Sequence, residues 1–332
     1  MNEKLAHRWM KPVAVLLWML TAGVVLSSIW LMVVPWYLRR MAFEELKRHG
    51  EIVISEHGES VTFDLNDQEQ DRETVADLAV LLKRVRCTDL VLSDCRNLKD
   101  LDGLEQAASL RRLYLDSTPV SDLTPLARVS GLAELHLDGT PVSDLTPLAG
   151  LSELTHLQLT GTPVSDLTPL AGLTTLARLH LGGTHVSDLS PLAGLSGLTV
   201  LNLCETQVSK LTPLAGFRRM ILLDLSNTPV SDLSPLSGLS GLVELHLGGT
   251  RVSDLSPLAG SSELYWLDLR GTRVSDLSPL AGLSGLTWLD LRGTQVSDLS
   301  PLDGLMQLAS INVGKDQDLR IPDSLEKFIK RH

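Results

Sequence analysis

The strongest constraint on the fold of this 332-residue chain is a motif that returns every 22 residues. A leucine marks one position of nine successive copies, Ile311 takes that position in the last copy, and a threonine follows at a fixed spacing in each leucine copy. The threonines are Thr118, Thr140, Thr162, Thr184, Thr206, Thr228, Thr250, Thr272 and Thr294. Leu90 begins an earlier copy that is one residue longer, so eleven strands are expected. A fixed period of about 20 to 29 residues is typical of a solenoid of stacked repeats.

Each part of the repeat has a physical role. In the copy that begins at Leu132, residues 135–137 predict a short parallel strand with its leucines inward and His136 outward. Thr146 followed by Pro147 predicts an N-cap hydroxyl that opens a short helical turn. Because no repeat can bury its leucines alone, neighbouring copies must cover them and both ends need caps.

Two segments are candidates for these caps. Residues 51–89 predict a hairpin followed by a capping helix over 67–86. Residues 315–332 predict a C-terminal cap, in which Leu325, Phe328 and Ile329 form one face of a helical lid.

The L-x-x-L-x-L pattern with its period of 22 resembles the leucine-rich repeats of bacterial internalins and of a regulatory subunit of eukaryotic protein phosphatase 1. The resemblance covers residues 90–314 and implies an α/β solenoid, a horseshoe with parallel strands on its concave face and short helical turns on its convex side. These families usually carry asparagine where this chain carries threonine. A hydroxyl makes fewer hydrogen bonds than a carboxamide, but it can still bond a neighbouring backbone group.

The N-terminal region predicts a membrane anchor. Residues 13–34 form an uncharged apolar run of 22 residues, which as a helix spans about 33 Å, enough for a bilayer core. Trp9, Trp36 and Tyr37 flank it, as is typical of a membrane interface. We therefore expect a short tail over 1–12, a transmembrane helix over 13–34 and a juxtamembrane helix over 35–50. The alternative is a cleaved signal peptide, whose apolar run would be shorter, about 7 to 15 residues.

The basic residues on the two sides of this anchor are nearly equal in number, so they give only a weak preference for its orientation. Three Lys or Arg residues precede the span and four follow it. The short basic tail favours a single-pass membrane protein whose repeat domain is extracytoplasmic.

Charge and motifs exclude several functions. Residues 1–50 hold seven Lys or Arg residues against three Glu residues, so residues 51–332 carry 22 basic and 37 acidic side chains, a net charge of −15. Such a surface repels phosphate, so no nucleic-acid partner is expected. The sequence contains no Gly-rich phosphate loop, GxSxG or HExxH motif. It therefore predicts a binding protein that is not an enzyme and needs no cofactor.

The repeated acidic and histidine residues do not predict a metal site. Eight copies carry an aspartate at one position, and Lys210 interrupts the series. Recurrence favours a structural role, in which these carboxylates bond nearby backbone. His136, His180 and His246 lie two or three repeats apart, too far to share an ion.

A partner-binding site is predicted on the concave face. Trp266 and Trp288 occupy the same strand position in adjacent copies, so their rings should be neighbours. The other candidate residues surround them in sequence: Tyr265, Asp268, Asp290, Arg270, Arg292, Arg251 and Arg273. Exposed tryptophans ringed by Arg and Asp have the composition of a protein-binding hot spot. The alternative is that the pair stacks on itself, with Asp–Arg pairs stabilising the strands.

The function that follows is a membrane-anchored leucine-rich repeat protein that binds a partner protein through its concave face. The alternative is a cytoplasm-facing, membrane-tethered scaffold or enzyme regulator, as the phosphatase resemblance implies.

Overall fold

The computed structural model describes residues 51–54, 60–64 and 88–332, with side chains in the last range. All of them belong to the second of two compact units, Leu46–His332. The tail, the membrane span, the juxtamembrane helix and the capping helix predicted over 1–12, 13–34, 35–50 and 67–86 lie outside the described residues. Within the described ranges, no helix has the length and apolar character needed to cross a bilayer.

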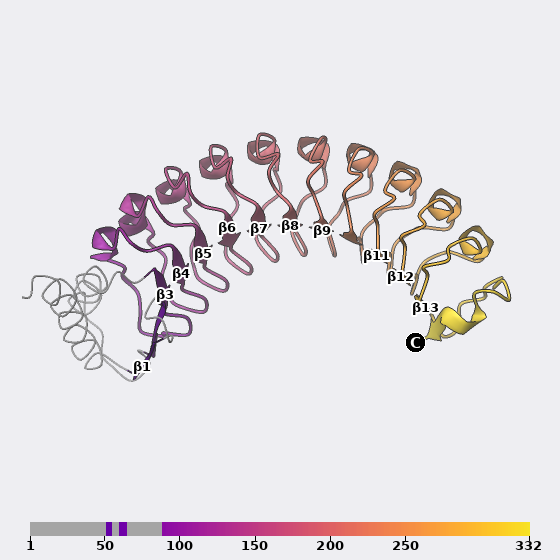
Figure 1. The fold of residues 1–332 in the computed structure, drawn as a ribbon, viewed down its shortest axis with the longest axis horizontal. Helices are drawn as coiled ribbons and strands as arrows, with labels where there is room; N and C mark the ends of the chain where they lie inside the picture. The colour runs from indigo at the N-terminus through magenta and orange to yellow at the C-terminus, as the bar shows by residue number, and fades with distance from the viewer. Residues whose placement is uncertain (1–50, 55–59, 65–87) are drawn as a thin grey trace, which may run out of the picture. The chain divides into compact units, whose positions relative to one another are not determined.

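The unit is built on one sheet of 14 strands that lie side by side in chain order. β1 and β2 pair antiparallel, and every later pair is parallel. Neighbouring strands are in register by one repeat, so that Leu135 lies opposite Leu157. The strands line the inner side of an arc of repeats, and the helical turns line the outer side (Figure 1). The predicted repeat solenoid is therefore confirmed.

The strands are short because each repeat contributes only a few residues to the sheet. Their bounds are β1 Glu51–Ile54, β2 Ser60–Asp64, β3 Asp89–Val91, β4 Arg112–Tyr114, β5 Glu134–His136, β6 His156–Gln158, β7 Arg178–His180, β8 Val200–Asn202, β9 Leu222–Asp224, β10 Glu244–His246, β11 Trp266–Asp268, β12 Trp288–Asp290, β13 Ser310–Val313 and β14 Ile329–Arg331.

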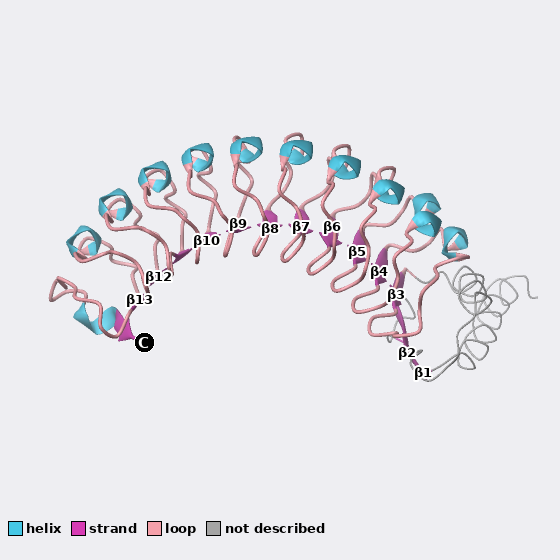
Figure 2. Cartoon of the chain, turned by 180° about the vertical axis from the view of Figure 1, so that it is seen from behind, coloured by secondary structure: helices cyan, strands magenta, loops and turns pink. Residues whose placement is uncertain are grey.

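The helical turns on the convex side are 3-10 turns, and the part of the chain that the structure describes contains no α-helix (Figure 2). In the turn at Thr146–Leu148, the N–H of Leu148 donates to the carbonyl of Leu145 at 2.9 Å, the three-residue step of a 3-10 helix. These turns are Leu104–Gln106, Thr124–Arg128, Thr146–Leu148, Thr168–Leu170, Ser190–Leu192, Thr212–Leu214, Ser234–Leu236, Ser256–Leu258, Ser278–Leu280 and Ser300–Leu302. A further 3-10 turn, Glu326–Phe328, directly precedes β14 at the C-terminal end.

The predicted N-cap role of Thr146 is wrong. Leu145 occupies the N-cap position and Thr146 begins the turn, so the hydroxyl lies one residue too late to cap it. The cap-like contact comes from Asp144, whose Oδ1 accepts the N–H of Thr146 at 2.8 Å. The same contact recurs at Asp122, Asp144, Asp166, Asp188, Asp232, Asp254, Asp276 and Asp298. The aspartate series therefore bonds backbone, as its recurrence predicted.

The core consists of columns of leucine, and a threonine column closes it. Leu135, Leu137 and Leu148 are fully buried, and the equivalent residues of the other repeats extend each column. Thr140 is also buried, and its Oγ1 donates to the carbonyl of Leu137 at 2.7 Å. All nine threonines of the series make this contact. The hydroxyl thus satisfies a buried carbonyl within its own turn.

The C-terminal lid differs from the predicted helix. After a single 3-10 turn at Glu326–Phe328, β14 pairs in parallel with β13. Leu325 is buried, whereas Phe328 and Ile329 are only partly covered. Without β14, the edge of β13 would present unpaired backbone N–H and C=O groups. A strand can form hydrogen bonds with these groups, whereas a helix cannot, because its own backbone groups are already paired.

Candidate functional site

The candidate site lies on the concave face of β9 to β12, where two outward columns run across the sheet. The first residues of these strands give Leu222, Glu244, Trp266 and Trp288, and the third residues give Asp224, His246, Asp268 and Asp290. Each member lies directly opposite the next, because the parallel register advances by one whole repeat.

The two tryptophans stack face to face. Their ring centroids are 3.6 Å apart and their planes differ by 11°. Both side chains are half-buried. The indole N–H of Trp266 is buried without a hydrogen-bond acceptor among the residues that the structure describes. The pair is therefore held by ring contact and not by a polar anchor.

Asp268 and Asp290 are expected to be exposed contact residues, but the structure shows that both are buried. They are 1% and 0% exposed, because the guanidinium groups of Arg270 and Arg292 cover them. Arg270 Nη2 donates to Asp268 Oδ2 at 2.6 Å, and Nε lies 2.9 Å from both carboxylate oxygens. Arg292 repeats this geometry on Asp290.

The Asp–Arg pairs also connect neighbouring repeats. Arg270 Nε lies 3.8 Å from Asp290 Oδ2, one strand along. The hydrogen bond to Asp268 raises the pKa of Arg270, and the bond to Asp290 does the same for Arg292. The four residues therefore form a charged cluster beside the tryptophan pair, and the side chains of Arg270 and Arg292 stay partly exposed, at 51% and 36%.

The other predicted site residues divide into two groups. Tyr265 immediately precedes Trp266 in the chain and is 48% exposed. Arg251 and Arg273 lie on the loops after β10 and β11, where their backbone N–H groups donate to Val230 and Val252. Within residues 88–332 they take no part in the Asp–Arg pairs, so the structure does not bring them into the cluster.

Sequence reasoning missed an apolar column beside the tryptophans. Ile221, Val243 and Tyr265 immediately precede the first strand residues, and backbone hydrogen bonds of 2.8 Å join each to the next. Ile221 and Tyr265, at 47% and 48%, are two of the three exposed large hydrophobic side chains among the described residues, and they lie in this one column. The 22-residue spacing that aligned the tryptophans could have identified this column.

Glu244 and His246 border the tryptophan pair on the β10 side. The His246 ring centroid lies 6.3 Å from that of Trp266, with the planes tilted by 37°. His246 Nε2 lies 3.8 Å from Glu244 Oε2, and the Glu244 side chain is 43% exposed. On its β10 side, Trp266 therefore has the His246 ring as its neighbour, and the accessible carboxylate of Glu244 lies next to that histidine.

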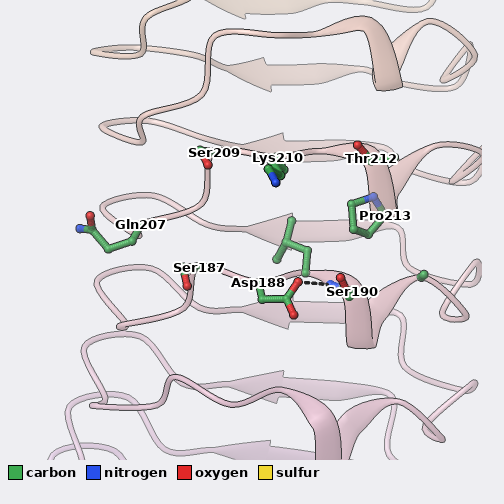
Figure 3. A pocket seen from close by; sticks show the side chains of 10 residues that line it. Ser187, Asp188, Ser190, Gln207, Ser209, Lys210, Thr212 and Pro213 are labelled. Atoms are coloured by element: carbon green, nitrogen blue, oxygen red, sulfur yellow. Dashed lines mark hydrogen bonds between the residues drawn. The ribbon is translucent and has the colours of Figure 1, made fainter.

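A depression lies away from the concave columns, between two successive repeats (Figure 3). It has a volume of about 710 Å³ and is lined by Ser187, Asp188, Gln207, Ser209, Lys210 and Pro213, among others. Lys210 stands where the other repeats carry aspartate, and Asp188 Oδ1 bonds the backbone N–H of Ser190. None of the predicted site residues lines it.

The histidines occupy separate surroundings. His136 contacts the ring of Tyr114 at 4.4 Å and Glu134 at 2.8 Å, whereas His246 contacts Trp266. Burial lowers the pKa of His180. Across the described ranges, no group of three or more His, Cys, Asp or Glu residues is arranged to hold a metal ion.

The repeat period, the inner parallel sheet and the outer 3-10 turns together define a leucine-rich repeat protein. Residues 218–260 match the family described as Leucine Rich repeats (2 copies). No curated protein sequence matches the chain significantly.

Among solved structures, the chain is similar to two internalins of Listeria monocytogenes str. 4b F2365. With the internalin inlF it shares 27% identity at a TM-score of 0.60, covering 73% of this chain and 85% of that one. With internalin C2 it shares 32% identity at a TM-score of 0.51, covering 63% and 83%.

The same fold occurs in a receptor bound to RNA. The TLR13–ssRNA13 complex gives a TM-score of 0.59 at 19% identity, over 78% of this chain and 44% of that one. At this identity the likeness concerns the fold alone.

Proposed function

We propose that this leucine-rich repeat protein binds a partner protein through its concave face, with Trp266, Trp288 and Tyr265 as the central contacts. The observation that carries the proposal is the half-buried, stacked tryptophan pair on that face. Tryptophan, tyrosine and arginine are the residues that most often dominate binding energy in protein interfaces. Here all three types occur within two repeats.

The rigidity of the site supports this proposal. Each carboxylate of Asp268 and Asp290 also accepts the backbone N–H two residues on, at 3.0 and 3.1 Å. The arginines that cover them are thereby fixed in place while remaining partly exposed. A side chain that is already ordered loses little conformational entropy on binding, which favours affinity.

The test is differential capture by the full chain. Wild type, the double variant Trp266→Ala/Trp288→Ala and the control Tyr114→Ala would each be crosslinked to cell-surface and envelope proteins and compared by mass spectrometry. We expect a partner that wild type and the control retain and the double variant loses. Capture by the double variant at the wild-type level, with its circular dichroism unchanged, would rule out this site.

We further propose that residues 13–34 anchor the protein in a membrane with the repeat domain on the extracytoplasmic side. The support is the uncharged run of 22 residues and the short basic tail before it. Protease digestion of the repeat domain in intact cells is the expected result. Protection until the cells are permeabilised would instead favour a cytoplasm-facing scaffold or enzyme regulator.

A further inference from the structure

The strands around the tryptophan pair carry more carboxylates on their outward positions than arginines that pair with them. The outward positions of β9 to β12 carry four carboxylates: Asp224, Glu244, Asp268 and Asp290. Only Asp268 and Asp290 are covered by arginines. Among the described residues, neither Asp224 nor Glu244 is paired with an arginine or lysine. Glu244 lies directly opposite Trp266 and has His246 as its neighbour at 3.8 Å, so the described surface holds an accessible carboxylate without an arginine or lysine partner next to the tryptophan pair.

The position of Glu244 relative to Trp266 is suited to a cation. The two residues lie directly opposite each other on β10 and β11. One face of the Trp266 ring is covered by Trp288. Its other face is directed toward β10, where the tilted ring of His246 lies 6.3 Å away between centroids and borders the space beside Glu244. A guanidinium or ammonium group placed there would contact the negative face of the indole and the carboxylate together.

The apolar column beside the tryptophans indicates which other side chains a partner would need to complement this surface. Ile221, Val243 and Tyr265 lie next to the strand column that carries Glu244 and Trp266, and two of the three are about half exposed. A segment that crosses these strands would meet apolar side chains along one line, and Glu244 and the two tryptophans along the next. The surface thus complements a segment that presents both aliphatic and basic side chains.

The geometry points to a partner segment that combines arginine or lysine with aliphatic residues, its cation seated between Trp266 and Glu244. This inference rests on the proposed function, because it specifies the partner chemistry of the same site. The net charge of −15 over residues 51–332 favours the same basic partner through long-range attraction.

A peptide selection tests this inference and does not require the natural partner. A library of displayed random dodecapeptides would be selected on the full chain, kept in detergent, and the enriched peptides would be measured by fluorescence anisotropy. Each would then be resynthesised with citrulline for arginine, a neutral side chain of nearly the same shape. The protein variants would be Glu244→Gln, Trp266→Ala/Trp288→Ala and the matched control Glu134→Gln. Glu134 occupies the equivalent position of β5, also beside a histidine, but the residue opposite it in the next repeat is His156.

We expect arginine, lysine and aliphatic residues to be enriched together. Citrulline replacement and Glu244→Gln should each weaken binding about tenfold, and the double tryptophan variant should weaken it more. Glu134→Gln should change binding less than twofold.

The opposite outcomes separate the two proposals. Peptides that depend on the tryptophans but contain no basic residues, or that bind equally well with citrulline, would overturn the cationic partner and leave the proposed binding site intact. Peptides that depend on neither tryptophan would overturn both. An equal loss from Glu134→Gln would show diffuse attraction to an acidic surface and would also overturn the inference.

Discussion

Trp266 and Trp288 lie opposite each other on adjacent parallel strands, and their ring centroids are 3.6 Å apart. Neighbouring strands in a sheet are about 4.8 Å apart, so the rings are closer than the backbones that carry them. The strands line the inner side of the arc of repeats and the 3-10 turns line its outer side (Figure 2). Side chains that project from the sheet toward the inside of such an arc converge. The curvature of the solenoid therefore brings the two indoles into contact.

The aromatic ring of Trp266, and not its indole N–H group, should account for the contribution of this residue to stability. Its N–H is buried without an acceptor in the described part of the chain, so Trp266→Phe keeps ring contact and removes an unsatisfied donor. We expect it to lower the free energy of unfolding by less than about 1 kcal/mol, and Trp266→Ala to lower it by about 2 kcal/mol. Urea denaturation measures both. Equal losses would show that ring stacking does not stabilise the fold.

Arg292 should be needed for stability because it covers Asp290. Arg292→Ala removes the guanidinium that covers Asp290, a residue 0% exposed in the wild type, and leaves its carboxylate with no cationic partner of its own repeat. We expect a loss of about 2 kcal/mol in the free energy of unfolding, partly restored in Arg292→Ala/Asp290→Asn. The control Arg251→Ala, an exposed arginine outside the pair, should leave stability nearly unchanged. If both single variants unfold alike, the Asp–Arg pair is only a surface contact.

The threonine column should depend on its hydroxyl and not on its shape. Thr162 Oγ1 donates to the carbonyl of Leu159 at 2.7 Å inside the core. Thr162→Val preserves volume but removes this donor, so we expect a loss of about 1 kcal/mol. Thr162→Ser keeps the donor and should lose less. A more stable valine variant in thermal unfolding would contradict this role.

The aspartate series should make stability fall at low pH. Hydrogen bonds from the hydroxyl and backbone N–H of the residue two positions on lower the pKa of Asp144 below its ordinary value of 3.8, and the other seven behave alike. A carboxylate whose pKa is lower in the folded state contributes stability above its unfolded pKa and loses it as pH falls through the folded pKa.

We therefore expect the Tm to be insensitive to these residues from pH 6 to about 4 and to fall as the pH approaches 2. A variant with asparagine at several positions of the series should show a flatter profile between pH 4 and 2. Identical profiles for the two proteins would show that these carboxylates are not linked to folding.

The repeat allows several features to be predicted from the sequence. A strict period fixes register, so the inward leucines, the eleven repeat strands and the adjacency of Trp266 and Trp288 follow directly. The same spacing contains the apolar column of Ile221, Val243 and Tyr265, but these residues precede the strands and their exposure does not follow from the alternation of strand residues.

Other features depend on where side chains and chain ends turn, which a period does not encode. Asp268 is expected to be exposed because its position alternates outward, but the long side chain of Arg270 folds back over it. The spacing of Leu325, Phe328 and Ile329 predicts a helix, but residues 329–331 pair with the open edge of β13 as a strand. The 3-10 turn begins one residue earlier than the Thr-Pro pattern indicates, so Asp144 and not Thr146 provides the capping contact.

The sequence by itself thus determined the architecture, because each 22-residue copy can bury its leucines only against a similar neighbour. It also determined which residues share a column on the sheet. The tertiary structure decided which of those residues a partner can reach. The curvature of the array brings the two tryptophan rings into contact, arginines cover two carboxylates, and Glu244 stays accessible on the strand next to Trp266. These features depend on the length of side chains and on the bend between repeats, and the spacing of residues in the sequence encodes neither.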